Sequence, residues 1–153
     1  MARASFADRM HQSAFAALYP WVIRLARLAG WKSDAAAVAV WHRGRLLVVE
    51  HSYMKGLSLP GGHIRSDELP VLAAARELEE EVGIVIAPAE IRLFGCLERR
   101  HTRLSLFECH LAQAPEIRID NREITAAAFK SPSSIPEPSR TLQSYLRARR
   151  AAA

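Results

Sequence analysis

Glu77, Glu80 and Glu81 are three carboxylates whose spacing suits joint binding of a cation. Separations of three and four residues place them on one arc of a helix, which turns by about 100° per residue. In an exposed helix such like charges repel by roughly 0.2–0.5 kcal/mol per pair, and a cation among them reverses that sign. The pattern predicts either a site for a hard divalent ion, Mg²⁺ or Mn²⁺, or a solvated acidic face.

The residues around the three glutamates favour the cation site. Gly61 and Gly62 precede them, and glycine lets the backbone approach a ligand closely. Arg76 can pair with Glu80 or reach back to Glu68, and either contact would hold a carboxylate in place.

A helix must carry these side chains, and the sequence predicts one from about Glu68 to Val82. Asp67 is the expected N-cap, and Gly83 is the expected stop at the C-terminal end. A second arc of this helix is apolar and is the predicted buried face, which comprises Val71, Ala74, Ala75, Leu78 and Val82.

Apolar runs on both sides of this helix predict strands, and the first two are apolar enough to be buried on both faces. A sharp turn is expected at Pro60-Gly61-Gly62, and a last helix from Ser139 to Arg149. The order of strands, helix, strands and helix predicts a mixed sheet with helices packed on its faces. The predicted strands are residues 35–41, 45–49, 90–98, 103–111 and 123–129.

The acidic stretch and its surroundings resemble the Nudix box of the Nudix hydrolase family. That pattern is G, five residues, E, seven residues, then R-E-U-x-E-E-x-G-U, where U is a bulky aliphatic residue. Residues 62–84 satisfy all nine specified positions, from Gly62 and Glu68 to the run that begins at Arg76 and ends at Ile84. The resemblance extends over about residues 35–130 and is weaker over the N-terminal segment.

The resemblance implies an α/β fold, a Nudix-type α/β/α sandwich with a mixed β-sheet. It also implies metal-dependent hydrolysis of a phosphoanhydride bond in a nucleoside diphosphate derivative. Glu77, Glu80 and Glu81 are then the ligands of Mg²⁺ or Mn²⁺, and the Gly61 carbonyl completes the coordination. Arg76 orients a glutamate. The supporting residues are Gly62, Glu68 as the partner of Arg76, and Gly83 as the end of the helix.

The general base varies within the family, so it is expected to be a box glutamate or Glu123, with Glu98 and Glu108 as rivals. Tyr53, in the loop before the box, is a candidate for stacking on a base. Arg99 and Arg103 belong to a basic run that could grip a phosphate. A solvated hairpin end explains that run equally well, and Trp41 is expected in the core.

The sequence leaves the substrate open between a (deoxy)nucleoside triphosphate and a nucleotide sugar. The alternative function is a non-catalytic nucleotide-binding domain or an RNA-related one. Because the box is intact, hydrolysis is favoured over binding alone. Nucleic acid as a partner would need a larger basic face than the sequence shows.

Composition sets broad limits on the class of protein. The 153 residues fit one domain, and 50% hydrophobic with 24% charged residues excludes a disordered or fibrous chain. The formal net charge of +5 favours anionic partners, although much of the excess lies at the two ends of the chain. Cys96 and Cys109 lie in apolar stretches and are expected to be buried free thiols, which suits a reducing cytoplasm.

Residues 1–31 are predicted to form an amphipathic helical segment that precedes a Nudix domain at residues 32–150. Such a segment could pack on the domain, form part of a homodimer interface, or make peripheral contact with a membrane surface. It is too short and too charged for a membrane-spanning helix, and Pro20 interrupts it. A signal peptide is the remaining alternative.

Overall fold

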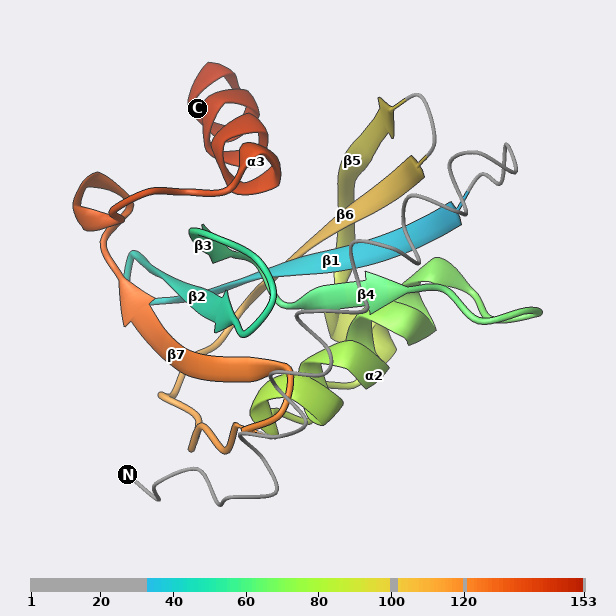
Figure 1. The fold of residues 1–153 in the computed structure, drawn as a ribbon, viewed down its shortest axis with the longest axis horizontal. Helices are drawn as coiled ribbons and strands as arrows, with labels where there is room; N and C mark the ends of the chain where they lie inside the picture. The colour runs from blue at the N-terminus through green and yellow to red at the C-terminus, as the bar shows by residue number, and fades with distance from the viewer. Residues whose placement is uncertain (1–32, 100–101, 120, 153) are drawn as a thin grey trace.

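The computed structural model describes residues 33–99, 102–119 and 121–152 (Figure 1). The predicted N-terminal helical segment, residues 1–31, therefore lies outside the described residues. Within the described part of the chain, no helix is both long enough and apolar enough to cross a membrane.

The described chain forms one mixed sheet with a helix on each side (Figure 1). The helices are α2 (Pro70–Val82) and α3 (Arg140–Ala151), with short 3₁₀ turns η1 (Pro88–Glu90) and η2 (Pro132–Ser134). The strands are β1 (Ser33–His42), β2 (Arg45–His51), β3 (Leu57–Ser58), β4 (Gly61–His63), β5 (Arg92–Arg99), β6 (Thr102–His110) and β7 (Ile124–Lys130).

Along one edge, the central strand β1 pairs with two different strands, β2 at its C-terminal end and β4 at its N-terminal end. On its other edge, residues 33–41 pair in parallel with β6, and β6 pairs with β5 antiparallel. On the first edge, Trp41 and His42 pair with β2, whereas residues 35–37 pair with β4. The sheet therefore opens between β1 and β2, and β4 lies beside β1 in that opening.

Alternate residues of the central strands face opposite layers of the core. Val38 and Val40 pack with Leu78 of α2, while Ala39 and Trp41 pack with Tyr145 of α3. In Figure 1, α2 accordingly lies below the sheet and α3 above it. Both faces of β1 and β2 are buried, as their apolar runs predicted, and the α/β/α sandwich is confirmed.

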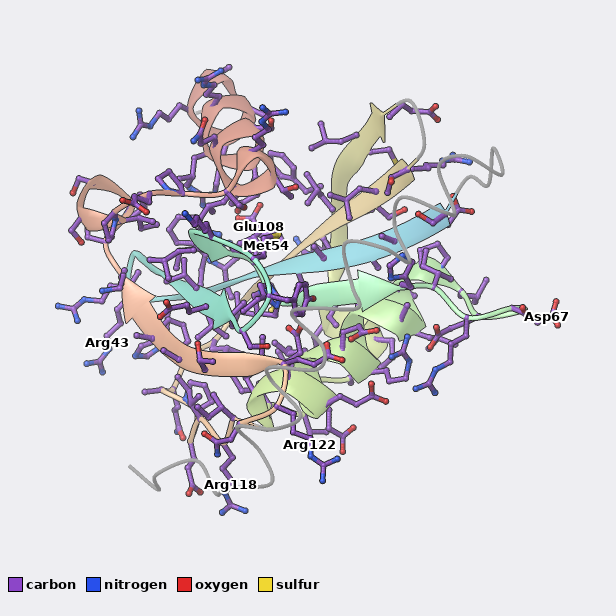
Figure 2. The ribbon with its side chains drawn as sticks, viewed as in Figure 1. Arg43, Met54, Asp67, Glu108, Arg118 and Arg122 are labelled. Carbon is purple, nitrogen blue, oxygen red and sulfur yellow. The ribbon has the colours of Figure 1, made fainter. Side chains whose placement is uncertain are left out.

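Helix α2 begins two residues later than predicted. Leu69, rather than Asp67, is its N-cap, and no side chain caps the helix there. Pro70 suits the first helical position, where its missing N–H is not needed, and it keeps Leu69 extended with ψ of 142°. Asp67 instead has φ of 63° at the tip of the β4–α2 loop (Figure 2), so Glu68 precedes the helix.

The Pro60-Gly61-Gly62 segment leads into strand β4 and does not form the sharp turn that was predicted. Gly61 and Gly62 pair with Ala37 and Ala36 of β1. A Cβ at Gly61 would lie 2.3 Å from the Ala36 carbonyl oxygen, and its φ of 152° is one that other residues rarely adopt. Glycine therefore allows this strand to approach β1.

Two further predictions need smaller corrections. Helix α3 runs from Arg140 to Ala151, because Ser139 is its N-cap and accepts a hydrogen bond from the Leu142 N–H at 3.3 Å. Of the two cysteines, Cys109 is buried as expected, whereas Cys96 is exposed. Burial raises the pKa of the Cys109 thiol to about 12.

Candidate active site on helix α2

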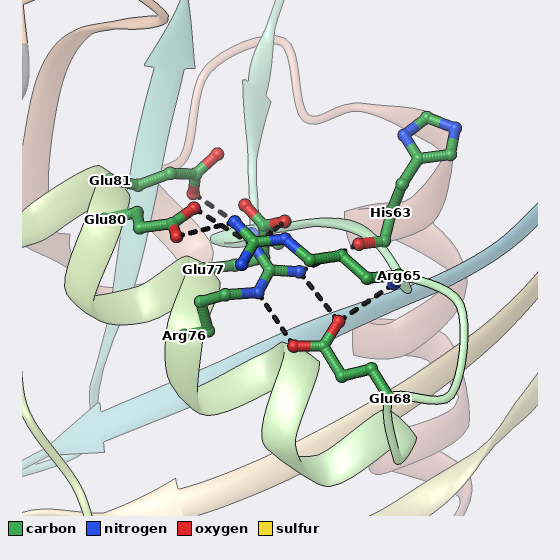
Figure 3. Close-up of polar contacts among 8 residues, drawn as sticks. His63, Arg65, Glu68, Arg76, Glu77, Glu80 and Glu81 are labelled. Carbon is green, nitrogen blue, oxygen red and sulfur yellow. Dashed lines mark hydrogen bonds and ion pairs between the residues drawn. The ribbon is translucent and has the colours of Figure 1, made fainter.

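Helix α2 directs two carboxylates, Glu77 and Glu81, at the backbone of β4, and Glu80 lies outside them (Figure 3). Glu81 is 5% exposed, and its Oε2 accepts a hydrogen bond from the Gly61 N–H at 3.0 Å. Glu77 lies against Gly62, where a Cβ would be 2.5 Å from its Oε1. Glu80 is the outermost, with 49% of its side chain exposed. Two of the three carboxylates that spacing placed on one face thus lie against β4.

The burial of Glu81 was not foreseen. The apolar face of α2 is centred on Ala74, Leu78 and Val82, and Glu81 lies at its margin, three residues after Leu78. A buried carboxylate is costly unless polar groups contact it, and the Gly61 N–H is one such group. Helical spacing predicted which face Glu81 shares, but only the position of β4 determines its depth.

Arg76 holds the carboxylates together. Its Nε and Nη2 donate to the two oxygens of Glu68 at 2.8 and 3.0 Å, and Nη2 also donates to the His63 carbonyl at 3.0 Å. Its Nη1 donates to Glu77 Oε1 at 2.7 Å and to Glu80 Oε2 at 3.0 Å. Both contacts that the sequence allowed for Arg76, to Glu80 and to Glu68, are therefore present. All five N–H groups have acceptors, and the side chain is only 17% exposed.

Arg76 and Glu68 stabilise each other's charged forms. Hydrogen bonds from Arg76, and then from the Arg65 backbone N–H, lower the pKa of Glu68 to about 2. The same pair raises the pKa of Arg76 above its usual value. Both groups are therefore charged throughout the neutral range, and Glu68 acts on the site through Arg76.

Arg65 is a contact of the site that sequence reasoning missed. Its Nη2 donates to Glu80 Oε1 at 3.0 Å, and its backbone N–H donates to Glu68 Oε2 at 2.9 Å. The residue lies in the β4–α2 loop, whose path depends on the positive φ of Asp67. Helix and strand periodicities do not predict the conformation of such a loop. The sequence position of Arg65, three residues after Gly62, was the only indication of this contact.

The donor set fits a hard divalent cation, although the carboxylates bond to N–H groups in this arrangement. Carboxylate oxygens are the ligands that Mg²⁺ and Mn²⁺ prefer. Within the described ranges, no three His, Cys, Asp or Glu side chains are already arranged to hold a metal ion. Glu77 and Glu80 nevertheless both contact one nitrogen of Arg76, so their carboxylates lie close enough together to share one positively charged partner.

Two predicted site residues lie together at the start of β7. The Ser52 N–H donates to the Glu123 carbonyl at 2.8 Å, and the rings of Tyr53 and His51 are 5.2 Å apart. The chain just before β7 passes the end of α2, where the Arg118 N–H donates to the Val82 carbonyl at 2.9 Å (Figure 2). Catalysis by Glu123 and substrate contact by Tyr53 remain predictions.

The two rival bases, Glu108 and Glu98, contact residues outside α2. Glu108 lies 3.0 Å from the His110 imidazole and 2.9 Å from the Arg149 guanidinium, in the layer of α3 on the opposite face of the sheet. Glu98 is 74% exposed on the β5–β6 hairpin and lies 3.7 Å from Arg103. Substrate binding by Arg103 remains a prediction, and the side chain of Arg99 lies outside the described part of the chain.

The NUDIX domain profile matches residues 31–147. The probable DHNTP pyrophosphohydrolase of Lactococcus lactis subsp. cremoris (strain MG1363) is 41% identical over 49 residues, which are 32% of this chain and 30% of that protein. The RNA pyrophosphohydrolase of Hydrogenovibrio crunogenus (strain DSM 25203 / XCL-2) is 32% identical over 66 residues, 43% of this chain and 39% of that one. The matched segments thus span less than half the length of either relative.

The fold is also similar to that of solved structures. The MutT NUDIX hydrolase from Burkholderia pseudomallei superposes with a TM-score of 0.69 at 21% identity, covering 76% of this chain and 97% of that one. At this identity the likeness concerns the fold alone. The domain profile covers most of the chain and includes the carboxylates of α2, and the chain therefore belongs to the Nudix family.

Proposed function

We propose that this protein hydrolyses a phosphoanhydride bond in a nucleoside diphosphate derivative, using Mg²⁺ or Mn²⁺ held by Glu77, Glu80 and Glu81. The observation that carries the proposal is the position of Glu81 and Glu77 against Gly61 and Gly62, with Arg76 joining Glu77 to Glu80. Nudix hydrolases generally use divalent metal ions. Both curated relatives are named pyrophosphohydrolases, which supports the same type of reaction.

A bound divalent ion would polarise the diphosphate oxygens and make a water molecule more acidic. The chain supplies the positioning. Arg76 fixes Glu77 and Glu80, and the Gly61 N–H fixes Glu81, so the ligands need little rearrangement as charge develops. The Gly61 carbonyl remains a proposed further ligand.

The proton of the attacking water requires a carboxylate base. Water adds to phosphorus, the bond to the bridging oxygen breaks, and the base takes the proton. We assign this role to Glu123 or to a glutamate of the box. Glu123 is half-buried and lies beside the loop that carries Tyr53. Loss of most turnover in Glu123→Gln, with metal binding unchanged, would identify it.

The proposal is tested by replacing the ligands with their isosteric amides. Glu80→Gln and Glu81→Gln should lower kcat by about a hundredfold or more, because the amide removes the charge that binds the cation. The fold should persist, since the amide oxygen that Glu81→Gln introduces can still accept from the Gly61 N–H. Full activity in either variant, with unchanged circular dichroism, would refute the assignment.

The substrate class is settled by a screen with product identification. Nucleoside triphosphates, nucleotide sugars, dinucleoside polyphosphates and 5′-triphosphate RNA would each be tested with Mg²⁺ and with Mn²⁺. We expect turnover of a nucleoside triphosphate or a nucleotide sugar. Binding without hydrolysis of any of them would favour the alternative of a non-catalytic nucleotide-binding domain.

A further inference from the structure

We propose that the Arg65 guanidinium bonds to a Glu80 oxygen that a divalent cation would otherwise bind, so that the cation must displace Arg65. Arg65 therefore weakens the metal affinity of the site. The inference rests on the proposed function, because it takes Glu80 to be a metal ligand. It concerns a residue that the Nudix box does not specify.

The two oxygens of Glu80 have different partners. Oε2 accepts from Arg76 and Oε1 accepts from Arg65, each at 3.0 Å (Figure 3). A cation can therefore take Oε1 from Arg65 while Arg76 keeps its hold on Oε2. Glu80 would remain oriented during the exchange.

The two arginines differ in how firmly they are held. The Arg76 side chain is 17% exposed and has acceptors for all five N–H groups. The Arg65 side chain is 64% exposed, and within the described part of the chain its guanidinium makes one hydrogen bond, to Glu80. An exposed pair of this kind contributes little stability, so the Arg65 side chain is the one that can leave.

The backbone at Arg65 stays fixed when its side chain leaves. Its N–H donates to Glu68 Oε2, its carbonyl accepts from the Glu68 N–H at 3.1 Å, and the neighbouring Ile64 N–H donates to the Asp34 carbonyl at 2.9 Å. The exchange thus needs rotation about side-chain bonds and no movement of the loop.

Two effects make Arg65 an antagonist of metal binding. The cation must break the ion pair, and it then lies near a second positive charge. The first effect alone amounts to a factor of about two to five in affinity, as for other exposed pairs. With the repulsion added, removal of Arg65 should tighten cation binding by roughly three- to tenfold.

The test measures binding of Mn²⁺ to the full chain without nucleotide, from the electron paramagnetic resonance signal of the free ion at physiological ionic strength. We expect a lower Kd in Arg65→Ala than in the wild type. Arg118→Ala is the matched control, because Arg118 is 74% exposed, pairs with one carboxylate (Glu116, 2.8 Å), and gives the same change in net charge. Its Kd should stay within about twofold of the wild type.

Combination with Glu80→Gln separates the inference from the proposed function. When Glu80→Gln is already present, Arg65→Ala should tighten Mn²⁺ binding by a clearly smaller factor than in the wild-type background, because the ion pair is absent and only the charge repulsion remains. If the wild type binds Mn²⁺ and Arg65→Ala binds it equally or more weakly, the inference is wrong while the proposed function stands. If neither the wild type nor Arg65→Ala binds Mn²⁺, with or without nucleotide, the metal site itself is wrong.

Discussion

At the scale of single residues, the site depends on how closely the Glu77 carboxylate lies against a glycine. A Cβ at Gly62 would meet all three atoms of that carboxyl group within 2.7 Å. The carboxylate is also fixed by Arg76 Nη1 at 2.7 Å. The missing side chain of Gly62 therefore makes room for the Glu77 carboxylate. Gly61 differs, because its missing side chain makes room for the backbone of β1.

Gly62→Ala should lower kcat by about ten- to a hundredfold while leaving the fold intact. The added methyl group must push the Glu77 carboxylate out of place, and misplacement of a positioned group by about 1 Å can have that effect. Only the end of a flexible side chain must move, so the free energy of unfolding should change little. Steady-state kinetics and urea denaturation measure the two quantities.

Gly95→Ala is the control for this substitution, because no atom lies within 4 Å of a Cβ built there. It should retain wild-type turnover. If Gly62→Ala were as active as Gly95→Ala, Glu77 would not be positioned as described.

At the scale of elements, α2 carries the site but begins without a side-chain cap. Leu69 is the N-cap residue, has extended φ and ψ of −70° and 142°, and is 63% exposed. Serine in this conformation would accept a hydrogen bond from a first-turn N–H that lacks a helical partner. The leucine loses little burial when it is replaced, because most of its surface is already in water.

Leu69→Ser should therefore raise the free energy of unfolding by about 0.5–1 kcal/mol. Leu93→Ser is the comparison, because Leu93 is 61% exposed but lies in β5, where a hydroxyl caps nothing. Urea denaturation of both variants decides the point. Equal stabilities for the two would mean that α2 does not begin at Pro70.

Local sequence patterns predicted some features of these elements and not others. Helical periodicity predicted that Glu77, Glu80 and Glu81 share one face, and apolar runs predicted the strands to within a few residues, because both depend on local spacing. The β4–β1 pairing, the burial of Glu81 and the Arg65–Glu80 contact depend on segments that are distant in sequence or on a loop with positive φ. Local patterns carry no information about those.

At the scale of the whole molecule, α3 stabilises the fold on one face of the sheet, whereas α2 carries the proposed chemistry on the other face. Tyr145 of α3 is fully buried, and its hydroxyl accepts from Trp41 Nε1 at 2.7 Å. Arg149 lies over the Trp41 ring at 4.1 Å and binds Glu108. These contacts fasten α3 to the face of the sheet opposite α2, which carries the glutamates.

Tyr145→Phe should lower the free energy of unfolding by about 1–3 kcal/mol, because the buried Trp41 N–H loses its acceptor. Turnover at a temperature well below the transition should remain at the wild-type level, since the change lies across the sheet from α2. Thermal denaturation and a kinetic assay on the same sample test both parts. An unchanged Tm, or loss of turnover in a folded sample, would contradict this division.

We propose above that Glu77, Glu80 and Glu81 together bind a divalent cation next to a diphosphate. The most direct measurement is an anomalous difference map from crystals soaked with Mn²⁺ and a non-hydrolysable nucleotide. We expect an anomalous peak within coordination distance, about 2.0–2.3 Å, of carboxylate oxygens on α2, with a phosphate oxygen also bound to the ion. Bound nucleotide without a peak at these carboxylates, or with the ion held by other residues, would contradict it.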